Sequence, residues 1–458
     1  MTPFPKEQTT KGKILADYMA YEREFKGIGP RRSAALLSIF GDSLKSAVLD
    51  IDQTVIDTIG ELPAINASVV LQNRGAELDL LDWLYGMQLE FSRTNAIRIA
   101  RAWGNVGLTA LRENPYLLLG LASWSVVDRI AKSEGISETD IRRQIGAIET
   151  VLSGEECLGS GSTSVSIQKL VSSATKLLGY PIFSSAIDES INKGGATKLG
   201  NQIQPPGAAY MEAQCALKLA QLVLQPIAGG AFGVGSVDLS IASYEKTLGI
   251  SLSAAQISAI RKAHLHRFMI LGGYAGSGKT TVLKGICDTL EGVGKKPLII
   301  TLSGRAAQRA SEATGRRAQT VARFLIERSQ NASNLTGENV LIVDEASMLG
   351  LVEVWRILRK LGDASLILCG DPAQLPPVSP GVIFHTLVED PEIPRVVLDR
   401  VHRQEESTGI PAIAEGVREG RPPILAGFEG ATHGVTFSEC GFSKLCDNDT
   451  GHATMMAA

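Results

Sequence analysis

The pattern of apolar and polar positions divides the chain into two parts. Up to about residue 180, apolar side chains recur at three- and four-residue spacing, as in Val127, Ile130 and Ala131. This spacing predicts a succession of short helices over residues 1–180. Residues 181–235 contain Gly- and Ser-rich stretches and predict a linker of helix and loop.

Beyond about residue 235, short apolar runs alternate with stretches of helical character. The runs occupy residues 268–271, 297–302, 339–343, 365–368 and 395–398. Alternation of this kind predicts a parallel β-sheet covered by helices. We expect this α/β domain to span residues 236–395, and residues 396–458 to begin a further, incomplete domain with a tail.

Composition narrows the class of protein. The 458 residues are enough for two or three domains, and 44% hydrophobic with 20% charged residues is typical of a globular protein. A net charge of −3 excludes a uniformly basic protein but allows local basic stretches. No apolar run approaches the ~18 residues that span a bilayer, so we expect a cytoplasmic protein with no membrane partner. The six cysteines form no C-x-x-C pair, which argues against zinc.

One segment carries a specific nucleotide-binding pattern. Residues 273–280, Gly-Tyr-Ala-Gly-Ser-Gly-Lys-Thr, match the phosphate-loop pattern G-x-x-x-x-G-K-[ST] between a predicted strand and helix. Backbone N–H groups of such a loop bind phosphate oxygens. Lys279 is expected to reach the β and γ phosphates of ATP, and Thr280 to bind Mg²⁺. The predicted ATP-binding residues of this segment are Gly273, Ala275, Gly276, Ser277, Gly278, Lys279, Thr280 and Thr281.

Two further strands end in polar residues suited to hydrolysis. Asp344 and Glu345 follow the run 340–343, and Gln374 lies in the turn after the run 365–368. Asp344 is predicted to hold Mg²⁺, Glu345 to activate the attacking water, and Gln374 to sense the γ-phosphate. Because ligands of open α/β sheets lie at the carboxyl ends of strands, the three turns are expected to converge.

The order and wording of these motifs resemble RecD-like helicases of superfamily 1. The resemblance rests on the phosphate loop, on residues 344–347 (Asp-Glu-Ala-Ser), on 370–376 (Gly-Asp-Pro-Ala-Gln-Leu-Pro) and on 398–404 (Leu-Asp-Arg-Val-His-Arg-Gln). It implies a RecA-like P-loop NTPase fold, ATP hydrolysis and 5′-to-3′ movement on DNA. It also implies that Gln256 binds adenine and that Arg403 reaches the γ-phosphate. The single-strand contacts that it implies are Thr301, Gly304, Arg305, Thr320 and Arg323.

A glycine turn near the N-terminus resembles a helix-hairpin-helix DNA-binding element. Residues 25–41 place Gly27-Ile-Gly29 before a helix that begins with Pro30. In such elements the glycine backbone approaches a nucleic-acid phosphate, so Gly27, Gly29 and the cation Arg31 are predicted DNA-binding residues. The alternative is a turn that merely packs two helices together.

Basic residues are also concentrated between residues 295 and 328, with eight basic side chains against two acidic ones. This excess suits a groove along a DNA backbone, although a solvated helix face gives the same pattern. Ala322 stands where the resembled family has a histidine, which weakens the predicted contact of Arg323.

Further motifs of the second motor domain are not found after residue 423. We therefore expect an ATP-dependent helicase acting on single-stranded or junction DNA whose second motor domain is incomplete, with a possible protein partner supplying the missing half. A DNA-binding ATPase or ATP switch without unwinding is the main alternative. A small-molecule kinase on the same loop is a weaker one.

Overall fold

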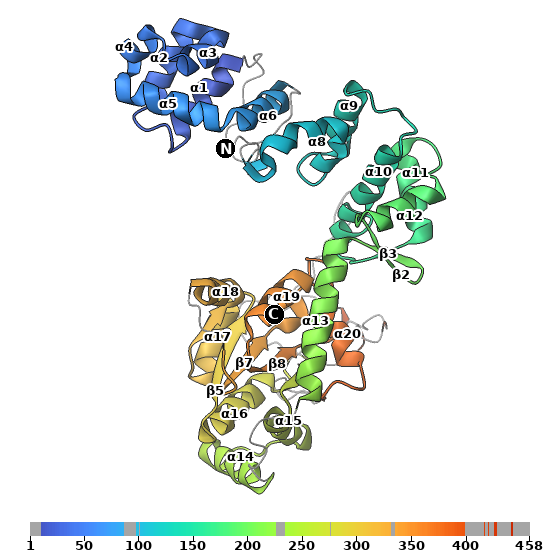
Figure 1. Cartoon of the computed structure of the whole chain (residues 1–458). Coiled ribbons are helices and arrows are strands. Elements are labelled where there is room, and N and C mark those ends of the chain that lie inside the picture. Colours follow the sequence, from blue (N-terminus) through green and yellow to red (C-terminus); the bar gives the residue numbers. More distant parts are fainter. Residues whose placement is uncertain are drawn as a thin grey trace. The chain divides into compact units, whose positions relative to one another are not determined.

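A computed structural model describes residues 11–86, 98–99, 101–225, 234–274, 276–330 and 335–398, together with 416, 420, 426–427 and 441–442. The chain forms two compact units (Figure 1), one of residues 1–157 with 164–205 and one of residues 158–163 with 206–458. The predicted linker of residues 181–235 is therefore divided. Its residues 206–224 form helix α13, which belongs to the second unit because it packs against α19 and β4 of the sheet.

The first unit is helical, as the apolar spacing predicts. A small antiparallel sheet in the order β1-β3-β2 joins its later helices and was not predicted, because its strands are two or three residues long. The elements are α1 Lys11–Tyr21, α2 Pro30–Phe40, η1 Gly41–Ser43, α3 Leu44–Leu49, α4 Gln53–Ile59, α5 Glu61–Asn73, α6 Gly75–Gly86, η2 Gly104–Val106, α8 Gly107–Glu113, η3 Pro115–Leu118, α9 Trp124–Ser133, α10 Ile141–Ser153, β1 Val165–Ser166, α11 Ile167–Leu178, α12 Ser184–Asn192, β2 Thr197–Leu199 and β3 Gln202–Gln204.

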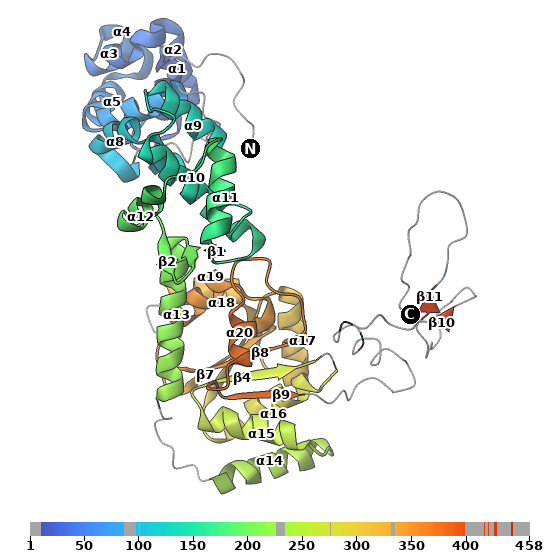
Figure 2. The same ribbon diagram turned by 90° about the vertical axis from the view of Figure 1, so that its right-hand side faces the viewer.

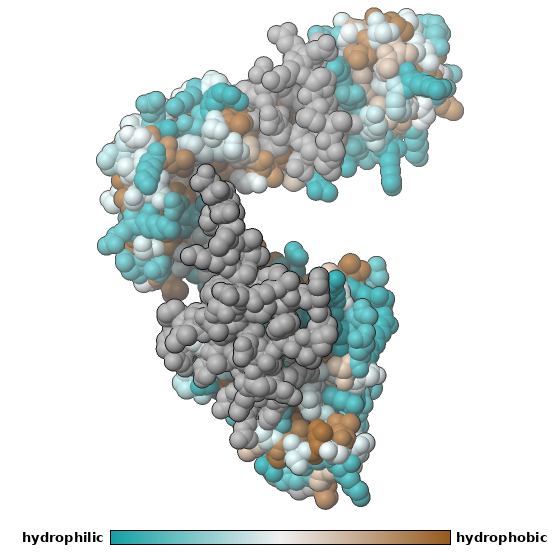
Figure 3. Space-filling view, turned by 180° about the vertical axis from the view of Figure 1, so that it is seen from behind, coloured by the Kyte–Doolittle hydropathy of each residue, from teal (hydrophilic) through white to brown (hydrophobic). Residues whose placement is uncertain are grey.

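Two apolar clusters hold this unit together. One extends from α1 to α9 and includes Leu36, Leu71 and Leu81, and the other joins α10, α11 and the small sheet. Among the described residues, no single helix is long and apolar enough to cross a membrane. The bent helix pair α4–α5 has the length and composition of a membrane span, on those two criteria alone. The face in Figure 3 is largely hydrophilic, with hydrophobic residues in small groups.

The second unit is built on a six-stranded parallel sheet in the order β6-β5-β7-β8-β4-β9. Five of these strands were predicted. β6 was not, because its three residues form no apolar run. The strands are β4 Phe268–Gly273, β5 Lys296–Thr301, β6 Ala318–Thr320, β7 Asn339–Asp344, β8 Ser365–Gly370 and β9 Arg395–Leu398.

Helices cover both faces of this sheet, which separates two apolar cores (Figure 2). One core lies under α13 Pro206–Leu224, α18 Val321–Gln330, α19 Leu351–Lys360 and α20 Ile383–Glu389. The other lies under α14 Val234–Leu248, α15 Ala254–Leu265, α16 Lys279–Gly292 and α17 Gly304–Thr314. Burial on both faces explains why the central strands read as continuous apolar runs rather than alternating ones.

The strand register aligns the predicted functional positions along one edge. Thr320 of β6 pairs with Thr301 of β5, and Thr301 pairs with Asp344 of β7. Gly370 of β8 pairs with Gly272 of β4, one residue before the phosphate loop begins. The carboxyl ends of the strands therefore deliver the motifs to a common edge of the sheet.

Candidate active site

The phosphate loop joins β4 to α16 through glycines in left-handed conformations. Gly276 and Gly278 have φ of 79° and 86°, a region that is costly for residues with a Cβ atom. Gly278 is the N-cap of α16, so the helix begins at Lys279 with its first N–H groups free for an anion. The buried Ser277 hydroxyl oxygen has no hydrogen-bond partner among the described residues. The loop thus offers unpaired polar groups at a helix N-terminus.

Lys279 lies against its own loop and a neighbouring strand end. Its Nζ donates to the carbonyl oxygens of Gly273 and Tyr274, the second at 3.1 Å. It also lies 3.9 Å from the Asp371 carboxylate, which follows β8 and is buried. The ammonium group therefore sits between the phosphate loop and the turn that carries Gln374.

The two adjacent carboxylates after β7 lie in different environments. Asp344 accepts a hydrogen bond of 3.0 Å from the Glu345 N–H. Burial raises the pKa of Asp344, and hydrogen bonds from that N–H and from the Cys369 thiol oppose the rise in part. Glu345 has φ 57° and ψ 34°, a left-handed conformation rare for a residue with a side chain. Such outliers cluster at functional sites, where they fix the direction of a side chain.

Gln374 is positioned by a buried serine. Ser347, which follows Glu345 in the short helix η5 Ala346–Met348, donates its hydroxyl to Gln374 Oε1 at 3.2 Å. The Gln374 N–H also bonds to the Asp371 carbonyl at 3.2 Å. These contacts connect the turn after β8 to the segment after β7.

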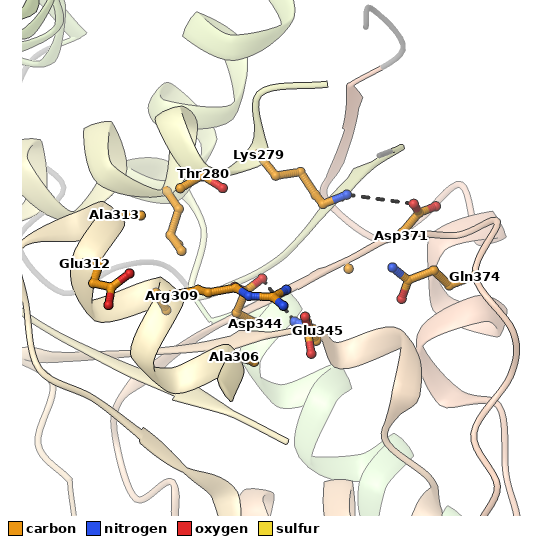
Figure 4. A pocket seen from close by; sticks show the side chains of 13 residues that line it. Lys279, Thr280, Ala306, Arg309, Glu312, Ala313, Asp344, Glu345, Asp371 and Gln374 are labelled. Atoms are coloured by element: carbon orange, nitrogen blue, oxygen red, sulfur yellow. Dashed lines mark hydrogen bonds and ion pairs between the residues drawn. The ribbon is translucent and has the colours of Figure 1, made fainter. Parts of the chain in front are cut away.

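These segments enclose one cavity of about 540 Å³ (Figure 4). The prediction that the three turns converge is confirmed, because each turn contributes residues to the lining of the cavity. The roles predicted for the individual side chains stay predictions. The lining residues are Lys279, Thr280, Leu283, Ala306, Arg309, Ala310, Glu312, Ala313, Asp344, Glu345, Gly370, Asp371 and Gln374. Helix α17 supplies one wall that the sequence analysis did not foresee.

The lining fits a magnesium-bound triphosphate. Thr280 and Asp344 both line the cavity and would present a hydroxyl and a carboxylate oxygen, the ligand type that Mg²⁺ prefers. The unpartnered Ser277 hydroxyl and the N-terminus of α16 lie where phosphate oxygens would bind. Thr281 does not line the cavity; its carbonyl accepts from the Tyr244 hydroxyl at 2.8 Å.

The residue predicted to read adenine lies outside this cavity. Gln256 is buried near the start of α15, where its Oε1 accepts from the Ser253 N–H at 2.9 Å and its own N–H donates to Ser253 Oγ at 3.2 Å. This arrangement is a capping box. The side-chain oxygen and the backbone N–H of Gln256 therefore both serve to begin helix α15. Adenine binding by Gln256 stays a prediction.

The predicted single-strand contacts gather at the other end of the same sheet edge. Thr301 and Thr320 pair in register on neighbouring strands. Both side chains make local hydrogen bonds. Thr301 donates to the Ser303 carbonyl at 2.8 Å, and Thr320 accepts from the Arg323 N–H at 3.2 Å. Gly304 and Arg305 begin α17, and the Arg305 side chain is exposed.

The predicted basic groove is partly neutralised. Arg323 pairs with Glu327 at 2.9 Å, and Arg316 pairs with both Asp288 and Glu291. The local excess of positive charge is therefore smaller than the sequence count indicates. Glu327 lies on the same helix as Arg323, whereas the partners of Arg316 come from α16, outside the counted segment.

The predicted hairpin element forms a turn between α1 and α2. Gly27 has φ 84°, and a Cβ there would lie 2.9 Å from Pro63 of α5, so packing alone accounts for this glycine. Gly29 has φ −107° and open space around it, so the fold does not require a glycine there. Arg31 is exposed beside it, and Arg32 donates to the Gly27 carbonyl at 2.7 Å.

Two predicted site residues, Ala275 and Arg403, lie outside the described residues, as does most of the expected second motor domain. Three lining or supporting residues, Arg309, Asp371 and Ser347, were missed. Asp371 and Ser347 stand within the quoted motifs, so their sequence positions could have singled them out. No sequence signal distinguishes Arg309 from the other arginines of its segment.

A parallel sheet with a phosphate loop, adjacent carboxylates and a buried-serine-bound glutamine at one edge defines a P-loop NTPase of the α/β class. Comparison with known proteins agrees: residues 251–435 match the model of a family described as an AAA domain. The chain is 32% identical over 227 residues to the ATP-dependent RecD2 DNA helicase of Deinococcus radiodurans, a match covering 48% of this chain and 31% of that protein.

Two further relatives are a RecBCD enzyme subunit and a DNA helicase. The chain is 32% identical to the RecBCD enzyme subunit RecD of Mycolicibacterium smegmatis over 36% of this chain and 35% of the relative. It is 25% identical to the ATP-dependent DNA helicase PIF1 of Trypanosoma brucei brucei over 39% and 20%. A solved Pif1 helicase from Candida albicans aligns with a TM-score of 0.30 and 24% identity over 38% of this chain and 45% of that one.

Within part of its length, the chain is therefore similar to an AAA domain family and to RecD2 and PIF1 helicases. The match spans 31% of the RecD2 helicase and 35% of the RecD subunit, so it accounts for a part of each relative.

Proposed function

We propose that this chain is an ATP-dependent DNA helicase or translocase of the RecD-like type, which couples ATP hydrolysis to movement on single-stranded DNA. One observation carries the proposal: Lys279, Glu345 and Gln374, from three separate turns, line the same cavity at the carboxyl edge of a parallel sheet. The helicase relatives support the choice of DNA as the partner. Movement in the 5′-to-3′ direction rests on the resemblance alone.

The roles of the side chains follow from their positions. Lys279 binds the β and γ phosphates, which replace the loop carbonyls and Asp371 as its partners. Glu345 orients and deprotonates the attacking water, and Gln374 senses the γ-phosphate while Ser347 holds it. Thr280 and Asp344 would hold Mg²⁺, whose charge would stabilise the phosphate oxygens.

The DNA-binding part of the proposal has two components. At the sheet edge, Gly304, Arg305 and Thr320 would contact the DNA strand. The buried Thr301 pairs in register with both Thr320 and Asp344, which would link strand contact to the hydrolytic site. In the first unit, the Gly29 backbone and Arg31 would contact a phosphate without reading sequence. We assign single-stranded or junction DNA as the preferred substrate and 5′-to-3′ as the direction of movement.

The test is ATP hydrolysis by the purified chain with and without single-stranded DNA. Lys279→Ala is the disabling variant, and Lys284→Ala, a lysine of the same helix that does not line the cavity, is the matched control. We expect DNA-stimulated turnover that Lys279→Ala abolishes and Lys284→Ala retains. Glu345→Gln is expected to lower turnover about 10²- to 10⁴-fold with ATP binding intact.

Two results would contradict the proposal in different ways. ATP and DNA binding with turnover no higher than that of Lys279→Ala would favour an ATP switch. Turnover that DNA does not stimulate would favour a P-loop enzyme with another substrate. Unwinding of a duplex with a single-stranded tail, measured next, separates a translocase from a helicase.

A further inference from the structure

Helix α17 turns one face toward the nucleotide cavity. Ala306, Arg309, Ala310 and Ala313 lie at three- and four-residue spacing, which places them on one side of an α-helix, and all four line the cavity. Three of them are alanines, which leave space. Arg309 is thus the one long cationic side chain on this face.

Arg309 shares the cavity with a carboxylate of its own helix, Glu312, but does not pair with it. Glu312 follows it by three residues, but the Glu312 carboxylate accepts a hydrogen bond from Gln308 at 2.9 Å. Within the described part of the chain, Arg309 makes no ion pair, whereas Arg316 and Arg323 in the same segment do. In Figure 4 its side chain extends from α17 toward Asp344 and Glu345. The guanidinium group is therefore directed at the cavity.

The position of the predicted triphosphate decides which phosphate Arg309 would meet. Lys279 and Thr280 begin α16 and are placed for the β and γ phosphates, and Glu345 is placed for the water that attacks the γ-phosphate. A guanidinium group on the Glu345 side of the cavity is nearest to the γ-phosphate end. Its planar set of donors suits phosphate oxygens.

We propose that Arg309 contacts the γ-phosphate of the bound triphosphate, and so lets this motor domain distinguish ATP from ADP with a residue of its own helix α17. This inference rests on the proposed ATP site. It adds a cation from the wall of the cavity that α17, the neighbour of α16, supplies.

The experiment compares the binding of a non-hydrolysable ATP analogue and of ADP to the full chain at constant Mg²⁺. Arg309→Ala is expected to weaken binding of the ATP analogue about 10- to 100-fold, the effect of losing a charged hydrogen bond. ADP binding is expected to stay unchanged, and Arg309→Lys to recover part of the loss. Arg356→Ala removes an exposed arginine of α19 that does not line the cavity and is the matched control.

The outcomes separate this inference from the function on which it rests. If the wild-type chain binds neither nucleotide, the proposed ATP site fails. If the wild type binds both, but Arg309→Ala weakens them equally or not at all, the γ-phosphate contact is refuted. Thermal unfolding of each variant checks that the fold is retained.

Discussion

The Lys279 ammonium nitrogen lies 3.9 Å from the Asp371 carboxylate, which ties the phosphate loop to the turn after β8. Asp371 is buried and also accepts a hydrogen bond from the Ala373 N–H at 2.9 Å. The same carboxylate therefore shapes a turn and, on the proposed function, would compete with phosphate for the lysine.

This competition gives the first prediction. Asp371→Asn keeps an oxygen for the Ala373 N–H but removes the negative charge. A partly buried ion pair contributes about 1 kcal/mol, so ATP is expected to bind about 5-fold more tightly. Equilibrium titration with an ATP analogue measures it. Asp390→Asn is the control, because Asp390 accepts from the Glu392 N–H at 3.0 Å in a turn away from the cavity. Weaker ATP binding in Asp371→Asn would show that the carboxylate supports the site.

The second prediction concerns the orientation of Gln374. Ser347→Ala removes the hydroxyl that donates to Gln374. Because a hydrogen bond of this kind contributes about 1 kcal/mol, turnover is expected to fall about 5-fold while ATP affinity stays the same. Steady-state kinetics and ATP titration separate the two quantities. Ser379→Ala loses a similar bond, to Glu353 at 3.1 Å, and should leave turnover unchanged. A parallel loss of ATP affinity in Ser347→Ala would point to a disturbed phosphate loop instead.

The third prediction distinguishes the two glycines of the N-terminal turn. Gly27→Ala is expected to destabilise the first unit by about 1–2 kcal/mol, because of its φ of 84° and the approach of Pro63. Gly29→Ala has open space, so its cost should stay within about 1 kcal/mol. Gly29→Ala should nevertheless weaken DNA binding if the backbone meets a phosphate.

Urea unfolding and DNA titration at two salt concentrations measure both effects. The salt dependence identifies a phosphate contact, since binding to phosphates releases counterions. If Gly29→Ala binds DNA as the wild type does, the turn merely packs two helices.

The fourth prediction is a pH dependence of stability. The buried Arg143 pairs with Asp128 at 2.8 Å and stacks near Trp124, and Tyr116 donates to the same carboxylate. Burial acts to raise the pKa of Asp128, but the hydrogen bonds from Arg143 and Tyr116 outweigh it and lower the pKa from its ordinary value of 3.8. The stability from this pair is therefore complete above pH 3.8 and is lost as the pH falls through the lower folded pKa.

Asp128→Asn should cost about 3 kcal/mol near neutral pH, because it leaves a buried guanidinium group unpaired. It should also flatten the acid dependence. Lys132→Ala, which breaks the half-exposed pair with the same carboxylate, should cost less than about 1 kcal/mol. Tryptophan fluorescence in a Trp355→Phe background reports unfolding of the first unit. Equal losses of stability in Asp128→Asn and Lys132→Ala would contradict the assignment of this stability to the pair of Arg143 with Asp128.

Local patterns predicted much of the second unit. Consecutive residues were enough to identify the phosphate loop, the Asp344–Glu345 pair and five of the six strands. A strand buried on both faces is a continuous apolar run, and a phosphate loop needs its glycines at fixed positions. Their convergence followed from the general position of ligands at the carboxyl ends of parallel strands.

The sequence by itself therefore determined the type of fold and the chemistry at the ends of the strands. Only the tertiary structure decided that α13 belongs to the second unit, that Arg309 rather than Arg305 of the same helix lines the cavity, and that Asp371 meets Lys279. The physical reason is that the facing of a helix and the partner of a charge depend on contacts between segments far apart in the chain. No spacing of neighbouring residues records them.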